Sequence, residues 1–464
     1  MAPAYKLTYF EYTGLAEVSR FLMKFGGIDF EDCRIKMEEW PQLKAKFPFG
    51  QVPVLEYKGK IACQSLAIAR YLAKQVKLSG NDDWENLEID ATIDTINDLR
   101  MKLATWWFEA DEAKKKLIVE NFKKDNLSYY LPRLEAIVKK NKGFLAVGRL
   151  TWADFYWATI SPVFDMVTGI DALADYPELK AARERVNALP AVKKWIDERP
   201  NNLHINPLRS THILEKYYKN IKHTIKQIRD NAWCLVGAYK NHLSISDRLV
   251  VLEPVKVKQT MAPAYKLTYF DGRGLAETSR FLMKYGGIDF EDCRIKREEW
   301  PQWKPKFPFG QVPVLEHKGK VVGQSIAIAR YLAKQVKLVG NDDWENLEID
   351  AIVDTINDLR MKHAAWFYEP DEAKKKVIIE NIKKDTLPYY LPRLEEIVKK
   401  NKGFLAVGRL TWADFYWATV SQVFDVVNGI DTLANYPELK AARERVNSLP
   451  AIKKWIEVRP KTDF

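Results

Sequence analysis

The sequence has little cysteine and little histidine for its length. Its 464 residues include four cysteines and six histidines. The cysteines form no CxxC pair and no metal-ligand spacing, which argues against a disulfide framework, a zinc site and a dithiol redox centre. Four of the histidines fall between positions 204 and 242. We therefore expect reduced thiols and no metal.

Several sequence signals are also missing. No run of about 18 apolar residues occurs, and the start "MAPAYKLTYF" lacks the charged and apolar parts of a signal peptide. There is no glycine-rich phosphate loop, no HExxH and no GxSxG. These absences predict a cytoplasmic protein, disfavour a membrane, and exclude the common nucleotide, zinc-protease and serine-hydrolase sites.

The net charge of +11 is unevenly distributed. Residues 201–260 carry ten Lys/Arg and four Asp/Glu, so they supply +6 of that charge. Elsewhere the charges are mixed, as in "DEAKKK", which is typical of a solvated helix face. We therefore predict no nucleic-acid partner.

The chain contains a long internal duplication. Residues 1–200 align with 261–460 without a gap and differ at 37 positions. The connecting segment 201–260 has no counterpart in either copy. Its apolar residues Leu214, Tyr217, Ile221, Ile225 and Ile228 recur at helical spacing, which would suit a basic amphipathic helix on a membrane or partner. An unselected insert is the alternative, and both interpretations stay open.

Each copy reads as an α/β part followed by helices. Residues 5–10 and 29–35 predict strands with a helix between them, "VPVLEYKGKIA" predicts a hairpin turning at Lys58-Gly59, and a helix begins near Ser65. From residue 81 only helical patterns remain, including a capping-box start at Thr151 in "TWAD". The predicted domains are 1–80 (α/β), 81–200 (all-α), 201–260 (linker), 261–340 (α/β) and 341–464 (all-α).

Three local features of the α/β part suggest ligand binding. The Val52-Pro53 bond before a strand is a candidate cis-proline that would expose backbone groups of Val52, with an ordinary edge-strand proline as the alternative. Gln64 and Ser65 stand where a helix begins, and unpaired N–H groups there attract carboxylates. Trp40 and Lys44 could hold a second carboxylate. Two anion sites beside an extended backbone suggest a short acidic peptide as ligand.

A family resemblance accounts for these features. The motifs "YKLTYF", "EEWPQLK", "PFGQVPVLE", "QSLAIARYLAKQ", "DTINDLR" and "LTWADFYWA", in order and in both copies, resemble the sigma class of cytosolic glutathione transferases, especially those of insects. The resemblance implies a thioredoxin-like domain followed by an all-helical domain in each copy. It also implies glutathione as cosubstrate, no prosthetic group, and a dimer, formed here within one chain or between two.

The resemblance assigns residues to roles. Tyr9 and Tyr269 would activate the glutathione thiol. In the first copy, Trp40 and Lys44 would bind the glycine carboxylate, and Val52 before Pro53 would bind the cysteine backbone. Gln64 and Ser65 would bind the γ-glutamyl carboxylate, and Gln51 would add a polar contact. Asp98 would reach across the dimer to the γ-glutamyl amine. The equivalent residues of the second copy are Trp300, Lys304, Gln311, Val312, Pro313, Gln324, Ser325 and Asp358. The electrophile pocket would involve Leu15, Trp106, Phe108, Leu275, Trp366 and Tyr368.

Departures from the family pattern narrow the activity. Asn97 and Asn357 stand where some relatives pair acids around a divalent ion, so no metal is predicted. Leu15 and Leu275 stand where prostaglandin-isomerising relatives carry arginine. The expected activity is conjugation of glutathione to small hydrophobic electrophiles, with reduction of lipid hydroperoxides as a possible extension. A prostaglandin D synthase-like isomerase and a non-catalytic ligand-binding or structural relative remain alternatives.

The copies differ most at 11–18, 61–66 and 103–110, while the residues assigned to glutathione are identical. Leu103 against His363, and Phe108 against Tyr368, predict a more apolar electrophile pocket in the first copy. We expect equal glutathione binding and different electrophile preferences.

Overall fold

The computed structural model describes residues 3–200 and 263–462. The predicted linker 201–260, with both of its interpretations, lies outside the described residues. So does Cys234, while Cys33, Cys63 and Cys293 are free thiols.

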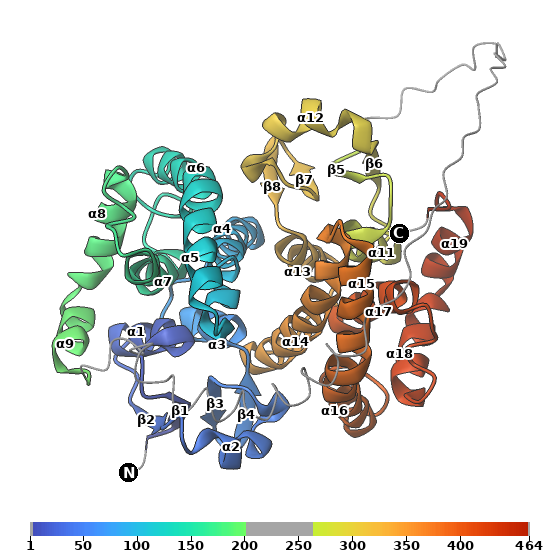
Figure 1. Ribbon diagram of the computed structural model, residues 1–464. Helices are drawn as coiled ribbons and strands as arrows, with labels where there is room; N and C mark the ends of the chain where they lie inside the picture. The colour runs from blue at the N-terminus through green and yellow to red at the C-terminus, as the bar shows by residue number, and fades with distance from the viewer. Residues whose placement is uncertain (1–2, 201–262, 463–464) are drawn as a thin grey trace. The chain divides into compact units, whose positions relative to one another are not determined.

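The first part of copy 1 is a mixed four-stranded sheet with strand order β2-β1-β3-β4. Strand β1 pairs parallel to β2 and antiparallel to β3, and β3 pairs with β4 as a hairpin. Figure 1 shows α1 and α3 together on one side of this sheet. The elements are β1 Tyr5–Phe10, η1 Gly14–Ala16, α1 Glu17–Phe25, β2 Phe30–Ile35, α2 Trp40–Leu43, η2 Lys44–Lys46, η3 Pro48–Gly50, β3 Val54–Tyr57, β4 Lys60–Cys63 and α3 Ser65–Gln75.

Local sequence explains this sheet well. The hairpin turns at Lys58 and Gly59, whose φ angles of 49° and 77° are those of a type I′ turn, so the predicted turn is confirmed. Leu7 and Leu55 face each other in the β1–β3 register and are fully buried under α1 and α3. The sheet therefore buries one continuous apolar layer against two helices.

The second part of copy 1 is helical. Its elements are α4 Asp83–Met101, η4 Ala104–Phe108, α5 Glu112–Asn121, the π-helical η5 Phe122–Leu127, α6 Ser128–Lys140, α7 Trp152–Thr168, α8 Pro177–Asn187 and α9 Pro190–Glu198. The start of α7 has the predicted form: Asp154 accepts hydrogen bonds from the N–H and the hydroxyl of Thr151, and from the N–H of Leu145. These bonds anchor a helix whose Trp152 and Trp157 fill the core.

Copy 2 has the same fold, with strand order β6-β5-β7-β8, an additional short helix η7 and a single helix α14 in place of α4 and η4. Its elements are β5 Tyr265–Phe270, η6 Gly274–Ala276, α11 Glu277–Tyr285, β6 Phe290–Ile295, η7 Arg297–Glu299, α12 Trp300–Trp303, η8 Lys304–Lys306, η9 Pro308–Gly310, β7 Val314–His317, β8 Lys320–Gly323, α13 Ser325–Gln335, α14 Asp343–Tyr368, α15 Glu372–Asn381, η10 Ile382–Thr386, α16 Leu387–Lys400, α17 Trp412–Asn428, α18 Pro437–Asn447 and α19 Pro450–Val458. The expected fold class is confirmed: each repeat has a thioredoxin-like sheet domain and an all-helical domain.

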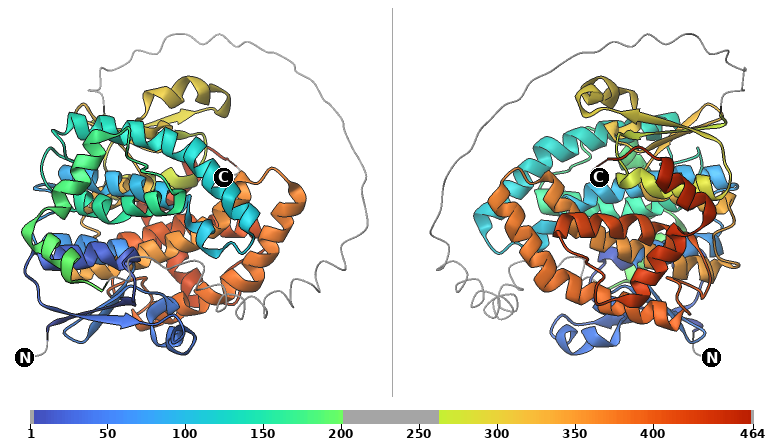
Figure 2. Two further views of the ribbon diagram at one scale, coloured as in Figure 1. Left: turned by 60° about the vertical axis from the view of Figure 1, so that its left-hand side comes forward. Right: turned by 90° about the vertical axis from the view of Figure 1, so that its right-hand side faces the viewer.

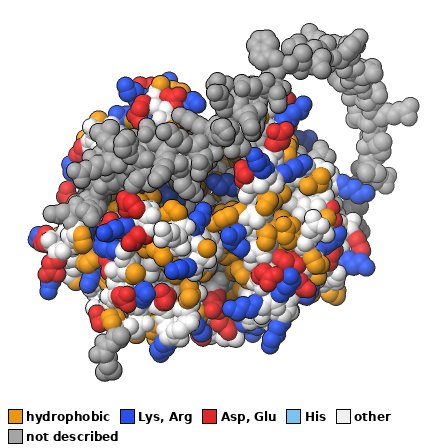
Figure 3. Space-filling model, turned by 60° about the horizontal axis from the view of Figure 1, so that its bottom comes forward, with side chains coloured by type: hydrophobic (Ala, Val, Ile, Leu, Met, Phe, Trp, Pro, Cys, Tyr) orange, Lys and Arg blue, Asp and Glu red, His pale blue; other side chains and the backbone are white. Residues whose placement is uncertain are grey.

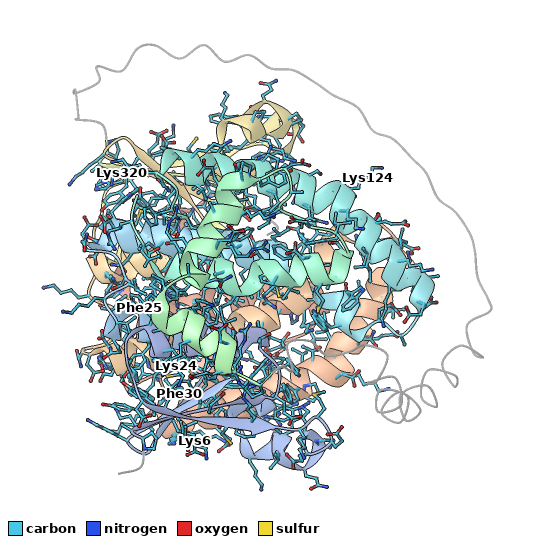
Figure 4. The ribbon with its side chains drawn as sticks, turned by 90° about the vertical axis from the view of Figure 1, so that its left-hand side faces the viewer. Lys6, Lys24, Phe25, Phe30, Lys124 and Lys320 are labelled. Carbon is cyan, nitrogen blue, oxygen red and sulfur yellow. The ribbon has the colours of Figure 1, made fainter. Side chains whose placement is uncertain are left out.

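Within each copy, buried polar bonds join the helical part to the sheet part. In copy 1, Glu17 of α1 accepts hydrogen bonds from Trp195 of α9 (2.9 Å) and from Arg199 (2.6 Å). The ammonium of Lys24 lies 4.9 Å from the Phe30 ring centroid and 5.0 Å from that of Trp195, and Figure 4 shows Lys24 beside Phe30. In the left view of Figure 2, the helices of this copy lie on the side of the sheet that carries α1 and α3.

The two copies form one compact unit through reciprocal contacts. Arg70 bonds Asp90 of its own copy (2.9 Å) and Asp350 of the other (3.2 Å), and Arg330 bonds Asp350 (2.9 Å) and Asp90 (3.1 Å). The result is a closed ring of two arginines and two aspartates. Because each of these buried charges has two opposite partners, the pairing offsets much of the cost of removing them from water, while the Arg330 Nη2 is buried without a hydrogen-bond partner among the described residues.

Lys and Arg side chains alternate with Asp and Glu over the face drawn in Figure 3, as mixed charge blocks predict. No helix within residues 3–200 or 263–462 has the length and apolar character needed to cross a membrane.

Candidate functional site

Tyr9 stands near the end of β1 with its hydroxyl turned to the following loop. It is 5% exposed, and the hydroxyl accepts a hydrogen bond from the Leu15 N–H at 3.2 Å. Tyr269 is bound in the same way by the N–H of Leu275 at 3.2 Å. In each case the backbone N–H occupies an acceptor site of the phenol oxygen, so the phenol O–H can donate to another group.

Burial raises the pKa of Tyr9, and the Leu15 hydrogen bond and the charges of Arg20 and Arg100 only partly offset it. The pKa of Tyr269 is raised for the same first reason. Both phenols are therefore protonated at neutral pH. A protonated phenol is a hydrogen-bond donor, so each site offers a donor and not a phenolate base.

A glycine lies five residues after each tyrosine, because the side chain of any larger residue would clash with the phenol. Gly14 has φ +45°, and a Cβ there would lie 2.6 Å from the Tyr9 hydroxyl oxygen. Gly274 has φ +40°, and its Cβ would lie 2.5 Å from the Tyr269 hydroxyl oxygen. This is the glycine shared by the otherwise different first loops, residues 11–14 and 271–274.

A fully buried arginine holds each first loop. Arg20 donates to the carbonyl oxygens of Tyr12 (3.1 Å) and Thr13 (3.3 Å), and to the carboxylates of Asp32 (2.9 Å) and Glu17 (3.1 Å). Arg280 makes the equivalent bonds in copy 2. Sequence reasoning missed this residue, whose signal is a Glu and an Arg three residues apart, Glu17 and Arg20, in a helix whose other buried residues are mostly apolar.

The segment after α2 carries most of the remaining predicted residues. The Val52-Pro53 and Val312-Pro313 bonds are cis, which confirms that prediction. Val52 lies outside the strand ladder, which pairs Thr8 with Val54. The indole of Trp40 is half-buried and packs on Phe10, with ring centroids 5.2 Å apart. Lys44 ends this short helix and is half-buried.

Helix α3 begins at a strained residue. Gln64 holds the N-cap position with φ 72°, a conformation that costs a non-glycine residue about 1–3 kcal/mol. Ser65 is therefore the first helical residue, as expected for a helix that begins near this position. Gln324 repeats this geometry with φ 74°. Such strain is common at ligand sites, and the free N–H groups of the first helical turn suit an anion.

The other copy contacts this strained glutamine. The Gln64 amide donates to Asp358 and to Thr355, both at 3.0 Å. The Gln324 amide donates to Asp98 at 3.0 Å and to Thr95 at 3.1 Å. Asp98 thus lies across the copies, where the resemblance placed it. Burial raises the pKa of Asp98 and of Asp358, and the glutamine hydrogen bonds partly offset this.

The residues predicted to line an electrophile pocket are less well assembled. Leu15 and Leu275 adjoin the tyrosine hydroxyls through their N–H groups, and Trp106 and Trp366 are half-buried. Tyr368 is 85% exposed, and after burial its phenol contributes to raising the pKa of Tyr269, so its assignment to the pocket stays a prediction. The Phe108 side chain lies outside what the structure describes.

Leu103 and His363, predicted to make the electrophile pockets differ in polarity, lie in the core of the helical domain. Both side chains are 1% exposed, inside the helical domain. His363 stacks on Phe424 with centroids 4.2 Å apart, and its Nδ1 bonds the Leu359 carbonyl oxygen at 3.0 Å. This substitution therefore changes the core of the helical domain and not the lining of a pocket.

Asn97, noted only as a departure from the family pattern, has a defined role in the structure. Its side-chain oxygen accepts hydrogen bonds from Arg100 (2.9 Å) and from the Tyr156 hydroxyl (3.0 Å). Asn357 does the same for Arg360 and Tyr416. Asn97 thus fixes Arg100, and Asn357 fixes Arg360. Against the rise caused by burial, the charges of these arginines lower the pKa of Tyr9 and of Tyr269, respectively. Within residues 3–200 and 263–462, no group of three or more His, Cys, Asp or Glu side chains could hold a metal ion.

Comparison with known proteins identifies the two halves of each copy. Residues 5–74 and 265–334 match the family model "Glutathione S-transferase, N-terminal domain", and residues 97–199 and 357–459 match "Glutathione S-transferase, C-terminal domain".

Single-copy relatives each align with about half of this chain. Glutathione S-transferase S1 of Drosophila melanogaster is 46% identical over 211 residues, which are 46% of this chain and 82% of the relative. A glutathione S-transferase of Anopheles gambiae is 45% identical over 43% of this chain and 99% of its own length. The hematopoietic prostaglandin D synthase of Gallus gallus is 44% identical over 43% and 98%.

Proposed function

Because the chain belongs to the glutathione S-transferase family, we propose that each of its copies binds glutathione and transfers its thiolate to small hydrophobic electrophiles. The chain is a glutathione transferase with two tandem units. We place it in the sigma class, of the insect type, and in the cytoplasm. The observation that carries the proposal is the protonated, buried phenol at the end of β1 and of β5, whose O–H is a hydrogen-bond donor.

Tyr9 and Tyr269 supply the chemistry. The phenol O–H donates a hydrogen bond to the glutathione sulfur, which favours thiolate over thiol. Each unit by which the thiol pKa falls corresponds to about 1.4 kcal/mol. The thiol proton leaves to solvent, the thiolate attacks an electrophilic carbon, a C–S bond forms, and the leaving group departs with its electron pair. The phenol keeps its own proton throughout.

The tripeptide lies along the residues between Trp40 and Ser65. Its γ-glutamyl carboxylate sits at the N-terminus of α3, on Gln64 and Ser65, where helix N–H groups and the helix dipole favour an anion. Its cysteine backbone pairs with Val52, and its glycine carboxylate with Trp40 and Lys44. Copy 2 uses the equivalent residues.

The two copies complete each other's site. Asp358 binds the γ-glutamyl amine of glutathione in copy 1, and Asp98 does so in copy 2; both carboxylates already contact the opposite glutamine. A cationic amine beside a buried carboxylate offsets the desolvation that raises its pKa. We propose that the working form is an internal pseudo-dimer, with pairing between two chains as the alternative.

Two finer activities belong to this proposal. Reduction of lipid hydroperoxides uses the same thiolate, which attacks the terminal oxygen, forms a sulfenic acid and releases an alkoxide that takes a proton from solvent to become the alcohol. A second glutathione then attacks the sulfenic acid sulfur, forming the disulfide and releasing water. Prostaglandin D isomerisation is the second candidate, favoured by the 44% identity to the avian hematopoietic prostaglandin D synthase. Leu15 and Leu275 weigh against it, because the resemblance places an arginine there in the isomerising relatives.

The deciding experiment is conjugation of glutathione to a chloronitrobenzene by the full chain and three variants. We expect Tyr9→Phe and Tyr269→Phe each to retain the rate of the unaltered copy, and the double variant to lose about 10²-fold or more, as for loss of one preorganised donor. Tyr5→Phe is the matched control: Tyr5 lies on the same strand, but its hydroxyl bonds Tyr71 at 2.9 Å. A double variant with full activity would refute the assignment.

A further inference from the structure

In each copy, a tyrosine hydroxyl donates a hydrogen bond to a backbone carbonyl oxygen of the other copy. Tyr129 of α6 donates to the carbonyl oxygen of Phe309 at 2.8 Å, and Tyr389 of α16 donates to the carbonyl oxygen of Phe49. The pairs are 180 and 340 residues apart in the sequence. The two bonds are equivalent under exchange of the copies, so they are part of how the copies pair.

The accepting residue is strained. Phe49 has φ 51° and Phe309 has φ 53°, in the left-handed region that costs a non-glycine residue about 1–3 kcal/mol unless its surroundings hold it there. Phe49 lies between Lys44 and Val52, both of which the proposed function assigns to glutathione. A hydrogen bond to its carbonyl therefore fixes the backbone that joins two parts of the binding segment.

The same tyrosine ring contacts the lysine proposed for the glycine carboxylate. The ammonium of Lys44 lies 5.3 Å from the Tyr389 ring centroid, and that of Lys304 lies 5.6 Å from the Tyr129 ring centroid. A Cβ on Gly50 would lie 2.9 Å from both the Lys44 Cγ and the Tyr389 hydroxyl oxygen. The aliphatic part of Lys44, Gly50 and the Tyr389 ring of the other copy are thus in direct contact. This contact restricts the conformations of the Lys44 side chain before a ligand binds.

The tyrosine is itself fixed within its own helix. The Arg393 guanidinium carbon lies 4.2 Å from the Tyr389 ring centroid, and Arg393 donates to the Tyr389 carbonyl oxygen at 2.5 Å. Arg133 holds Tyr129 in the same way, at 3.8 Å and 2.7 Å. The ring is preorganised before it meets the other copy.

We propose that Tyr389 and Tyr129 are positioning residues for the glutathione site of the opposite copy: Tyr389 sets segment 44–53 of copy 1, and Tyr129 sets segment 304–313 of copy 2. The inference rests on the proposed function, since it names what aligns that site. It predicts an effect in trans: a change in one copy weakens glutathione binding in the other and leaves its own site unaltered.

The test uses the full chain with one copy silenced. In a Tyr269→Phe background, where copy 1 works alone, we expect Tyr389→Phe to raise the KM for glutathione about three- to tenfold with kcat nearly unchanged, the range for loss of one buried hydrogen bond. In a Tyr9→Phe background, where copy 2 works alone, the same change should leave KM unaltered. Tyr129→Phe should give the opposite pattern, which makes each variant the control of the other.

Three outcomes would overturn the inference. One is an unchanged KM in both backgrounds, and another is an effect confined to the copy that carries the substitution. The third is a fall in kcat with an equal loss of thermal stability in both backgrounds, which would mean that the tyrosines only hold the fold. Calorimetric titration with glutathione separates this inference from its premise: unaltered binding in the variants overturns the inference alone, while absence of binding to the unmodified chain overturns both.

Discussion

The two copies carry the same sequence at more than four positions in five, yet one helix differs between them. Helix α4 ends at Met101 and is followed by the short helix Ala104–Phe108, whereas α14 continues without a break from Asp343 to Tyr368. Thr105 in copy 1 is Ala365 in copy 2, and alanine is the better helix former by several tenths of a kcal/mol. The side chain of His363 also bonds back to the carbonyl of Leu359 one turn earlier.

The other differences fall into sets that touch each other. Copy 2 has His363, Asn428 and Thr432 joined by hydrogen bonds, where copy 1 has Leu103, Thr168 and Ala172. Copy 2 has Arg273 bonded to Gln422 at 3.4 Å, where copy 1 has Thr13 and Pro162. The copies have diverged by matched exchanges beside the first loop and in the helical core, while the residues proposed for glutathione are identical.

The largest difference between copies can be created at the glycine beside the tyrosine that we propose activates glutathione. We expect Gly14→Ala, measured in a Tyr269→Phe background, to lower copy 1 conjugation by about 10²-fold, because the new Cβ would displace the Tyr9 hydroxyl and a shift of about 1 Å can cost that much. Gly274→Ala should do the same to copy 2. Gly27→Ala is the control: its φ is also positive, at +63°, but no atom lies within 4 Å. An equal loss in the control would assign the effect to backbone strain.

The interface predicts a pH dependence that both copies share. Burial raises the pKa of Asp94 and of Asp354 to about 7, against the charges of Arg330 and Arg70. The folded chain then keeps protons that the unfolded chain releases near pH 3.8, so stability falls as the pH rises from about 4 to 7 and levels off above. We expect Asp94→Asn with Asp354→Asn to melt at a higher temperature than the parent at pH 8, with a gain that vanishes toward pH 4.

The single variants Asp94→Asn and Asp354→Asn should then give equal gains if the copies are equivalent at their interface. Unequal gains would show that the interface is asymmetric, and a gain independent of pH would contradict the assignment of these carboxyls.

The core histidine predicts an acid sensitivity that copy 1 lacks. Burial lowers the pKa of His363 from 6.5, and its hydrogen bond to Leu359 offsets only part of this. In the unfolded chain His363 therefore binds a proton more readily than in the folded chain. The free energy of unfolding falls as the pH drops below about 6.5. Replacing His363, Asn428 and Thr432 by the Leu, Thr and Ala of copy 1 should remove that loss in thermal melts between pH 7 and 5. An unchanged pH profile would contradict it.

The smallest expected effect concerns the first loop. The Arg273–Gln422 bond ties that loop to α17 at partial exposure, so we expect a coupling energy below about 1 kcal/mol in a double-mutant cycle of Arg273→Thr and Gln422→Ala. Thr13→Arg in copy 1 should stabilise more when it is combined with Pro162→Gln, which supplies the partner seen in copy 2. Conjugation rates should change by less than about threefold. A tenfold rate change would mean that this arginine touches the substrate.

Much of the fold was predictable because its signals are local. The hairpin at Lys58-Gly59, the cis bond before Pro53 and the start of α7 at Thr151 depend on neighbours within a few residues. The exposure of Tyr368 could not be predicted because exposure is a tertiary property: this side chain, at the end of α14, is 85% exposed. The role of Arg20 was missed because its partners come from the first loop, α1 and β2 together.

By itself the sequence determined the duplication, the order of strands and helices in each copy, the family, and the tyrosine expected at the end of the first strand. It could do so because periodicity, turn-forming residues and motif spacing depend only on the sequence within one copy. Only the tertiary structure decided that Gln64 meets Asp358, that the Arg70 and Arg330 guanidiniums share two aspartates, and that Tyr389 reaches the backbone of Phe49. Those contacts join residues hundreds of positions apart, and the hydrogen bonds and ion pairs formed between the two surfaces offset the cost of removing their charges and donors from water.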